Sequence, residues 1–542
     1  MLVKQALIDF FERNDIRCIF QLPGIHTLPL NERLSHQKNM RIITCRHESD
    51  MIFMAQGYAK ASGRTGVLLV TAGPGLGNIV SGCMEAFHDD IPLFIIHIDV
   101  ETSELNKGIL HGIVEPENIF SRFIKKSYRV IDPTDLPQVL QQAYEEAGSG
   151  RRGPTLISVP HTMFGKEISG IAPVHKQIDA SDPVPKDRKE GDIRTFLHTF
   201  AELLKTKTNP IIVGGAALMT ENASLALNDI CRNSSIPFLS TTGGKGVVRE
   251  DNPYAFGNIM RKGVVRDILT SSDLIIAIGT RLRDVDAGRR GVSFRELVHI
   301  DIDDQWMDKN YAARLKFAGN VEEALLGIKR IMERKVFRWD LEHLKTLQRQ
   351  EEARLALSAP GYAVMKCIRD SIPESTTIAC DLNIPSYWSE YYLPVYLRNS
   401  FLMPRGVSPI FYSIPAAIGA RIARPDRPCL ALCGDGGALP TLSEIAVMKQ
   451  YNIPVVIFIY NNNSFAILED AMIDRYAIQG FMNLRNPDFV KLARAFDIKA
   501  KRTKTLKGLA RIFRNDVTWD EPFLIEFVHP VSPPPWRNQK NV

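Results

Sequence analysis

Short apolar runs and helical periodicity alternate along the chain, and one such unit is bounded by two polar clusters. The run Cys429–Cys433 is long enough for a buried strand, and Val455–Tyr460 is a second such run. Between them, Thr441–Gln450 has the spacing of apolar residues expected of a helix. A strand, a helix and a strand within about thirty residues predict a parallel crossover unit. The cluster Gly434–Gly437 then follows the first strand, and Asn461–Asn463 follows the second.

The residue types in these clusters suit a hard divalent cation at the carboxyl edge of the sheet, where open α/β sheets bind ligands. Asp435 offers a carboxylate oxygen, Asn462 an amide oxygen and Ser464 a backbone carbonyl. These three oxygens leave half of a Mg²⁺ octahedron for phosphate and water. The neighbouring glycines would let backbone N–H groups approach a diphosphate. A tight turn and an unrelated asparagine-rich loop form the alternative, but the fixed spacing of 27 positions from Asp435 to Asn462 favours a metal site.

Gly-Asp-Gly followed by Asn-Asn resembles the thiamine diphosphate motif. The resemblance implies that Asp435 and Asn462 hold the Mg²⁺ that anchors the cofactor's diphosphate. Ser464 is the third predicted metal ligand, on the chemistry of its carbonyl. It also implies that Ile410 is the bulky apolar residue that folds the cofactor into a V shape, although core packing alone would suit the same residue. The predicted cofactor-binding residues are Gly73, Pro74, Asp381, Ser408, Ile410, Gly434, Gly436, Gly437, Asn462 and Phe465.

A second signature occupies Arg46–Asn78. It resembles the pyrimidine-binding domain of acetolactate synthase and related 2-oxo acid enzymes, and Glu48 matches the glutamate that bonds the aminopyrimidine ring. A carboxyl group against a ring nitrogen stabilises the imino tautomer, which serves as the base at the cofactor's reactive carbon. An isolated glutamate here would instead indicate an acid that complements the dipole of a helix at Asp50–Ala61. Residues 56–59 (QGYA) and 72–75 (AGPG) favour the cofactor role.

The resemblance covers nearly the whole chain and implies an α/β fold of three doubly wound parallel-sheet domains: pyrimidine-binding, middle Rossmann-like and diphosphate-binding. We place them at residues 1–172, 193–335 and 358–530. A polar linker, Pro173–Asp192, follows the first, and a charged helical stretch, Met332–Leu357, leads to the third. The proline-rich tail Pro530–Val542 is expected to be a surface extension. Further predicted strands are Val67–Val70, Leu93–Ile98, Gly153–Pro160, Pro210–Gly215, Leu274–Gly279, Leu297–Asp303 and Pro522–Val528.

The middle domain carries glycine turns after predicted strands, at Gly243–Gly246 and Gly279–Leu282, where phosphates could be received. This segment resembles the domain that carries FAD in acetolactate synthases, so the resemblance allows FAD as a further cofactor. An empty Rossmann-like domain kept for packing is the alternative, because strand–glycine turns alone do not require a nucleotide.

The positions expected around the substrate match no single sub-family. Acetolactate synthases carry Phe-Gln-Glu where this chain has Gly112–Val114, and a tryptophan where it has Ala471. The glutamine of that group is therefore absent, and the pocket for a second substrate is expected to be wider.

Histidines are the other candidates. His111 resembles half of the His-His pair of pyruvate-type decarboxylases and could relay protons near neutral pH, although a satisfied histidine is an equally good interpretation. His26 is a further catalytic candidate, because its loop borders the active site in relatives. Those decarboxylases also use a glutamate where this chain has Leu468, and Glu469 lies one step later, which on a helix turns it to another direction.

Composition agrees with an ordinary enzyme and excludes some partners. The 542 residues suit about three domains, and 45% hydrophobic with 24% charged residues is usual for a globular protein. The formal charge of +6 is scattered without a basic stripe, so no nucleic-acid partner is expected. The first residues do not resemble a signal peptide, no run is long enough for a membrane span, and eight cysteines show no metal spacing. We expect a cytoplasmic protein with reduced thiols.

The sequence therefore predicts a thiamine diphosphate- and Mg²⁺-dependent enzyme that acts on a 2-oxo acid, with acetolactate synthase-like decarboxylation and carboligation first. A non-oxidative decarboxylase is the alternative that His111 favours. A C–C lyase or hydrolase on a diketone, and a cofactor-binding paralogue without turnover, stay open. The resemblance further implies a homodimer or homotetramer with active sites at the subunit interface, and its small-molecule partner is the 2-oxo acid.

Overall fold

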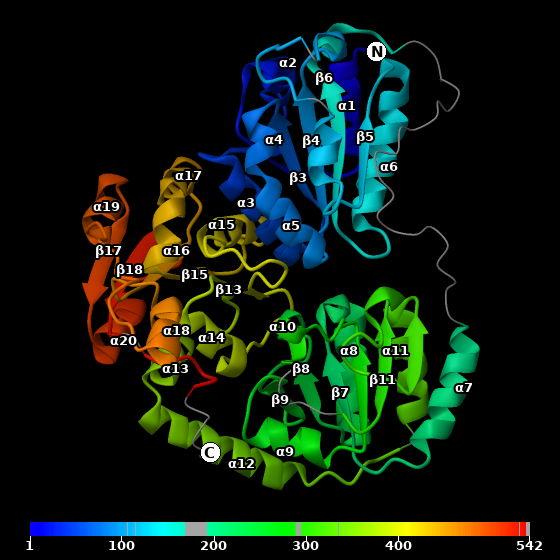
Figure 1. The fold of residues 1–542 in the computed structure, drawn as a ribbon, viewed down its shortest axis with the longest axis vertical. Helices are drawn as coiled ribbons and strands as arrows, with labels where there is room; N and C mark the ends of the chain where they lie inside the picture. Colours follow the sequence, from blue (N-terminus) through cyan, green and yellow to red (C-terminus); the bar gives the residue numbers. More distant parts are fainter. Residues whose placement is uncertain are drawn as a thin grey trace.

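Three six-stranded sheets, each with helices on its faces, make up the computed structural model (Figure 1). The structure describes residues 1–105, 107–113, 115–168, 192–288, 294–333, 335–530 and 532–537. All pairs of neighbouring strands in the three sheets are parallel, which confirms the predicted α/β class. The predicted linker Pro173–Asp192 lies outside the described residues except for Asp192, so its boundaries remain a prediction.

The first sheet has the strand order β2-β1-β3-β4-β6-β5. The predicted strands at Val67–Val70 and Leu93–Ile98 are confirmed as β3 and β4, whose apolar runs are buried because helices cover both faces of a parallel sheet. The strands are β1 (Cys18–Gln21), β2 (Arg41–Thr44), β3 (Gly66–Thr71), β4 (Leu93–Asp99), β5 (Lys126–Arg129) and β6 (Pro154–Pro160). The helices are α1 (Val3–Arg13), α2 (Leu28–Leu34), α3 (Glu48–Ser62), α4 (Pro74–Asn78), α5 (Val80–His88) and α6 (Leu136–Gly148).

The middle sheet has the order β12-β11-β10-β7-β8-β9. Its strands are β7 (Pro210–Gly214), β8 (Phe238–Ser240), β9 (Ala255–Asn258), β10 (Leu274–Ile278), β11 (Leu297–Asp301) and β12 (Leu315–Ala318). Its helices are α7 (Ile193–Leu204), α8 (Glu221–Ser234), α9 (Val264–Ser271), α10 (Asp284–Ala287) and α11 (Val321–Met332). The charged helical stretch predicted at Met332–Leu357 is confirmed over α12 (Leu341–Ser358), which begins after Asp340, whose side chain accepts the backbone N–H of His343, while α11 ends at Met332.

The third sheet, β14-β13-β15-β16-β18-β17, repeats the strand order of the first. Its strands are β13 (Thr377–Cys380), β14 (Phe401–Leu402), β15 (Cys429–Gly434), β16 (Val456–Asn461), β17 (Lys499–Thr503) and β18 (Phe523–Val528). Its helices are α13 (Pro360–Ser371), α14 (Ile384–Tyr392), α15 (Ser413–Ala423), α16 (Asp435–Ala438), α17 (Ile445–Gln450), α18 (Ala466–Tyr476), α19 (Phe489–Ala495) and α20 (Leu506–Asn515). The predicted crossover unit is confirmed, since β15 and β16 pair in parallel. The predicted helix at Thr441–Gln450 is confirmed as α-helical over α17 (Ile445–Gln450), while its first residues belong to a 3₁₀ helix, Leu439–Glu444.

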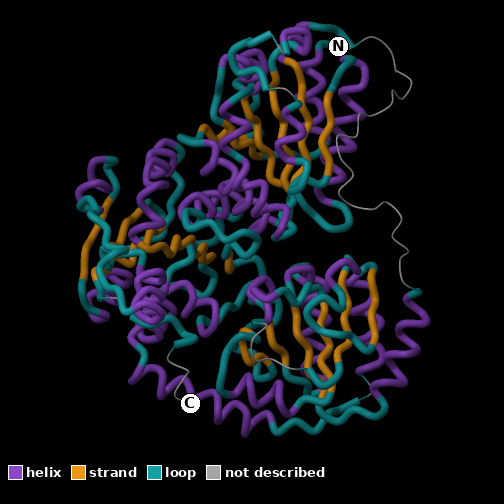
Figure 2. Tube along the Cα trace, in the orientation of Figure 1, coloured by secondary structure: helices purple, strands orange, loops and turns teal. Residues whose placement is uncertain are grey.

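Helices α3 and α15 join the first domain to the third (Figures 1 and 2). Their backbones meet at glycines: a Cβ on Gly57 would lie 2.0 Å from the Ala416 carbonyl oxygen, and one on Gly419 would lie 1.8 Å from that of Met54. Buried residues of the two domains consequently form one hydrophobic core. The equivalent helices of two equivalent sheets therefore pack face to face within one chain.

The tail is packed rather than extended over the surface. Ser532 is 2% exposed, the Pro533 carbonyl accepts the Trp388 indole N–H at 3.0 Å, and the Trp536 ring lies 4.8 Å from that of Tyr387. Arg537 pairs with Asp470 at 2.8 Å. The prediction of a surface extension is thus wrong for residues 532–537, because their aromatic and cationic side chains find partners on α14 and α18; residues 531 and 538–542 lie outside the described residues. In the described part of the chain, no helix is long and apolar enough to cross a membrane.

Candidate functional site

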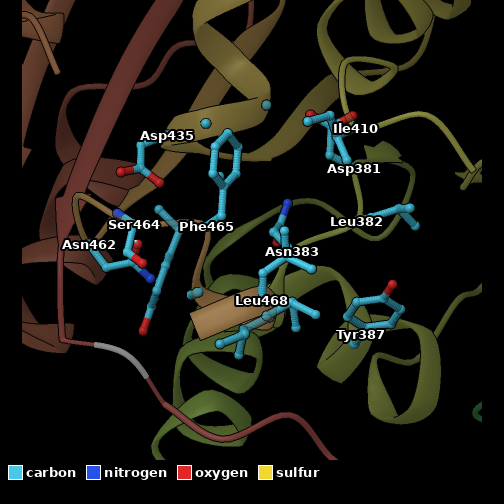
Figure 3. Close-up of a pocket in the computed structure, with 17 residues that line it drawn as sticks. Asp381, Leu382, Asn383, Tyr387, Ile410, Asp435, Asn462, Ser464, Phe465 and Leu468 are labelled. Atoms are coloured by element: carbon cyan, nitrogen blue, oxygen red, sulfur yellow. Dashed lines mark hydrogen bonds between the residues drawn. The ribbon is translucent and has the colours of Figure 1, made fainter. Parts of the chain in front are cut away.

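A cavity of about 360 Å³ lies at the carboxyl ends of β13, β15 and β16. Figure 3 shows its walls, which combine polar groups from strand ends with apolar side chains from α14 and α18. This is the edge at which parallel α/β sheets bind ligands. The lining residues are Asp381, Leu382, Asn383, Ile384, Tyr387, Ile410, Gly434, Asp435, Gly436, Gly437, Tyr460, Asn462, Ser464, Phe465, Ala466, Ile467 and Leu468.

The predicted metal ligands lie on one side of this cavity (Figure 3). Asp435, the first residue of α16, is 2% exposed; burial raises the pKa of its carboxyl group, while the side-chain amide of Asn486, which donates to it at 2.7 Å, lowers that pKa. Among the residues that the structure describes, the Asn462 amide oxygen accepts a single hydrogen bond, from the nearby N–H of Ser464 at 3.2 Å, and so keeps acceptor capacity. Asn461 instead turns its amide to Glu526 at 2.7 Å, which makes Asn462 the available asparagine.

These donors fit Mg²⁺ bound together with a phosphorylated cofactor. One carboxylate, one amide oxygen and one carbonyl are a set that Mg²⁺ completes with phosphate oxygens and water. Among the described residues there is no cluster of three or more His, Cys, Asp and Glu side chains suited to a metal. A metal bound here would therefore need further oxygen ligands from the cofactor's phosphates or from water.

Two glycines of the short helix α16 bring its backbone against two cavity walls. A Cβ on Gly436 would lie 2.4 Å from the Phe465 ring, and one on Gly437 would lie 2.3 Å from the Ile410 carbonyl oxygen. Side chains at these positions would push the walls away, so the close approach requires glycine. Gly434 also lines the cavity, so the backbone of residues 434–437 is accessible from it.

Asp381 has a supporting role at the top of the cavity. Its Oδ1 accepts the backbone N–H groups of Tyr412 and Ser413 at 2.7 and 2.8 Å, and burial raises its pKa to about 7. It therefore fixes the start of α15 just beyond Ile410. Ser408, predicted to bind the cofactor, does not line the cavity among the described residues; its N–H donates to Glu85 of the first domain at 2.9 Å.

Glu48 and its neighbours form a second group in the first domain. Glu48 begins α3, is 6% exposed, and its Oε2 accepts the Asn78 side-chain amide at 2.9 Å. Its Oε1 lies against the Gly73–Gly75 loop, where Gly73 has φ +71° and Pro74 opens α4. Both interpretations of Glu48 hold locally, since it is the N-terminal acid of a helix and also a buried carboxyl group beside the glycine loop.

His26 and His111 lie together with a third histidine that the sequence analysis did not select. The His26 ring lies 5.6 Å from that of His111 and 5.0 Å from that of His161. Burial lowers the pKa of His26, and the neighbouring imidazoles at positions 161 and 111 lower it further. His111 has φ +67° and packs against the Gly73 backbone. The cluster is therefore adjacent to the loop that also borders Glu48.

One chain does not bring the two groups into one cavity. All the lining residues lie between Asp381 and Leu468, and neither Glu48 nor the histidines belong to the wall among the residues that the structure describes. Glu469 is not available to replace a catalytic glutamate, because its carboxylate accepts the backbone N–H groups of Gly480 and Met482. The predicted residues thus divide into a diphosphate half and a pyrimidine half.

The carboxyl edge of the middle sheet, where the resemblance allows FAD, is covered by ion pairs with the first domain. Arg281 pairs with Asp90 at 3.1 Å, and Arg283 lies 3.5 Å from Asp89. Both guanidinium groups also donate to the backbone oxygen of His88. The phosphates of a dinucleotide would have to displace these pairs, so this edge fits FAD poorly.

Several residues of the site were missed by sequence reasoning. Asn383 lines the cavity and follows β13 as Asp435 follows β15, so its place after an apolar strand could have identified it. His161 likewise follows the predicted strand that became β6. Asn78 and Asn486, which hold the two carboxylates, carry no local signal of that kind.

Comparisons with known proteins match each of the three domains separately. The chain matches the N-terminal TPP binding domain of thiamine pyrophosphate enzymes over residues 1–119, their central domain over 197–328 and their C-terminal TPP binding domain over 384–527. It is 28% identical to a probable acetolactate synthase large subunit of Methanocaldococcus jannaschii, over 97% of this chain and 91% of that protein. It is 25% identical to the acetolactate synthase isozyme 2 large subunit of Escherichia coli (99% and 98%) and 28% identical to a probable 2-ketoarginine decarboxylase of Pseudomonas aeruginosa (97% and 93%).

Proposed function

The chain belongs to the thiamine pyrophosphate enzyme family, and within that family we propose that it is a Mg²⁺-dependent enzyme acting on a 2-oxo acid. Acetolactate synthase-like decarboxylation followed by carboligation is the first choice of reaction. The observation that carries the proposal is the cavity in which Asp435, Asn462 and Ser464 offer oxygen ligands beside a glycine turn. Acetolactate synthase subunits among the relatives support the choice of reaction.

When bound, thiamine diphosphate supplies a thiazolium carbon that adds to the carbonyl of a 2-oxo acid and accepts the electrons released as CO₂ leaves. The chain's own groups would prepare that step. Asp435, Asn462 and the Ser464 carbonyl would hold Mg²⁺, and Phe465 and Ile410 would wall the cofactor. Glu48, held by Asn78, would keep a proton at its carboxyl oxygen against the pyrimidine ring.

A non-oxidative decarboxylase is the second candidate. The cluster of His26, His111 and His161 favours it, since an imidazole can act as the general acid that delivers the proton turning the decarboxylated product into an aldehyde. The similarity to a probable 2-ketoarginine decarboxylase supports the same choice and suggests longer, basic 2-oxo acids as substrates to test.

We also propose that two copies of the chain build each active site. The pyrimidine half around Glu48 lies outside the cavity of its own chain, so a second chain is needed to supply it. A homodimer, or a homotetramer made of two such dimers, meets this requirement with a two-fold axis.

The test is purified protein with thiamine diphosphate, Mg²⁺ and a panel of 2-oxo acids that includes pyruvate and 2-ketoarginine, assayed for aldehydes and for acetolactate-type products. Acetolactate from pyruvate would support carboligation, and aldehyde alone would support the decarboxylase. Glu48→Gln should abolish product formation while cofactor binding persists. Turnover by Glu48→Gln at the wild-type rate would contradict the role of Glu48, and absence of cofactor binding by the wild-type protein would contradict the proposal as a whole.

A further inference from the structure

Glu85, on α5 of the first domain, is completely buried against a loop of the third domain. Its Oε1 accepts the backbone N–H of Gly406 at 2.8 Å, and its Oε2 accepts those of Val407 at 2.7 Å and Ser408 at 2.9 Å. A Cβ at position 406 would lie 2.5 Å from the Glu85 backbone oxygen, so Gly406 is required for this approach. Three charge-assisted hydrogen bonds from consecutive residues fix the course of the loop.

This loop leads directly to Ile410. The carboxylate of Asp381 holds the chain on the far side of Ile410, through the N–H groups of Tyr412 and Ser413. Ile410 and Asp381 lie together at one end of the cavity in Figure 3. Ile410 is 39% exposed, so packing restrains its side chain only in part, and the two backbone anchors contribute to its position.

A glutamate of the third domain holds backbone of the first domain in the same way. Glu444 of the third domain accepts the backbone N–H groups of Arg46 and His47, at 2.8 and 3.1 Å, immediately before Glu48. Glu85 belongs to the segment after β3 and Glu444 to the segment after β15, which are equivalent strands in two sheets of the same order. Each domain thus uses a buried glutamate to hold the backbone that precedes a cofactor-facing residue of the other.

We propose that Glu85 is a positioning residue: the first domain uses it to hold residues 406–408 and so sets where the Ile410 side chain stands against the bound cofactor. The inference rests on the proposed function, because the position of Ile410 matters only when thiamine diphosphate occupies the cavity. Glu85 itself touches neither cofactor nor substrate. A purely structural role would instead make it one more contact that stabilises the domain interface.

The test uses the full-length protein with thiamine diphosphate and Mg²⁺ and needs no known substrate. Its readout is the rate at which the C2 proton of the bound cofactor exchanges for deuterium, measured by NMR after an acid quench, together with the cofactor Kd and the melting temperature. Glu85→Gln keeps the shape of the side chain but replaces one acceptor oxygen by an NH₂ group, which cannot accept a hydrogen bond from the N–H groups of the loop. Glu351→Gln is the matched control, since this buried carboxylate also accepts a backbone N–H, from Val264 at 3.4 Å, outside the cavity wall.

We expect Glu85→Gln to slow C2 exchange by on the order of tenfold or more, because small displacements of positioning groups have large effects on rate. The cofactor Kd and the melting temperature should stay close to those of Glu351→Gln. Ile410→Ala should also slow exchange, and the double variant Glu85→Gln/Ile410→Ala should be no slower than Ile410→Ala alone. The inference would be overturned if Glu85→Gln exchanged the C2 proton at the wild-type rate. It would also be overturned if the double variant were slower than Ile410→Ala by the factor that Glu85→Gln alone produces.

Two further outcomes separate this inference from the proposed function. If the wild-type protein binds no thiamine diphosphate, the proposed function and this inference both fail. If the wild-type protein and Glu85→Gln both exchange the C2 proton rapidly, only this inference fails. Should Glu85→Gln not fold, Gly406→Ala displaces the same loop from the other side and must show the same slow exchange.

Discussion

Replacing Gly419 by alanine tests whether the crossing of α3 and α15 holds the first and third domains together. A Cβ at position 419 would lie 1.8 Å from the Met54 carbonyl oxygen. Carbon and oxygen atoms in such contacts normally keep roughly 3.3 Å, so the helices would have to separate by about 1.5 Å. Because both partners are backbone, no change of rotamer relieves the contact.

The expected cost follows from two opposing terms. Overpacking a tight contact costs about 1–3 kcal/mol, and the upper end applies to a clash between backbones. The better helix propensity of alanine offsets up to about 1 kcal/mol of this loss of stability. The net loss is therefore about 2 kcal/mol, which in a domain of this size lowers the melting temperature by about 4–8 °C.

Calorimetry of the Gly419→Ala protein measures this loss in the transition that separates the two domains. Gly148→Ala is the control, because a Cβ there would meet only the Thr65 hydroxyl oxygen, at 3.7 Å. This control should melt with the wild-type protein or slightly above it. If Gly419→Ala melts at the same temperature as Gly148→Ala, the two helices are not in backbone contact and the reasoning is refuted.

Three other outcomes follow from the site. Burial, and secondarily the charge of Glu444, raises the pKa of Asp50 from 3.8 to about 8. The folded protein therefore keeps a proton that the unfolded chain releases, and stability falls as the pH rises through that window. Asp381, whose pKa is raised to about 7, contributes to the same fall, so melting curves of Asp50→Asn should show a smaller fall than those of the wild-type protein, and an unchanged pH profile would exclude Asp50 as a source. Asn486→Ala removes the hydrogen bond that holds the Asp435 carboxylate, and it should weaken Mg²⁺ binding about 10- to 100-fold. If the Mg²⁺ concentration needed for cofactor binding is the same as in the wild-type protein, Asp435 is not a metal ligand. Trp536→Ala removes the aromatic contact with Tyr387 of the cavity wall, which is worth about 0.5–1.5 kcal/mol. Thiamine diphosphate should therefore bind up to about tenfold more weakly in a titration, and an unchanged affinity would show that the tail does not support that wall.

The diphosphate half of the site could be predicted because its information is local. Asp435 and Asn462 each follow an apolar strand within one crossover unit, and the sheet brings successive strand ends to one edge. Glu48 was found in the same way, from a signature of neighbouring residues. Many strands of the three sheets are similarly encoded in short apolar runs, although an edge strand such as β17 (Lys499–Thr503) is not, and the fold class followed from these runs together with the family resemblance.

Contacts between distant positions could not be predicted. Glu85 meets Gly406 across more than three hundred residues, and Glu444 meets Arg46 across almost four hundred. Neither glutamate differs locally from an ordinary helical acid, and only the docking of two complete domains gives it a partner. The tail was misjudged for the same reason, since Trp536 and Arg537 look like exposed residues until α14 and α18 are in place.

The crossing of α3 and α15 also has a consequence for the newly made chain. Twelve residues of α3 are buried, but α15, which covers much of this helix, begins at Ser413, about 350 residues after α3 ends at Ser62. At roughly 5–20 residues per second, a ribosome needs on the order of 20–70 s to synthesise that interval. During this time the first domain carries an apolar helix without its partner, so we expect nascent chains stopped before residue 413 to bind chaperones or aggregate, and longer ones to become soluble once α15 has emerged.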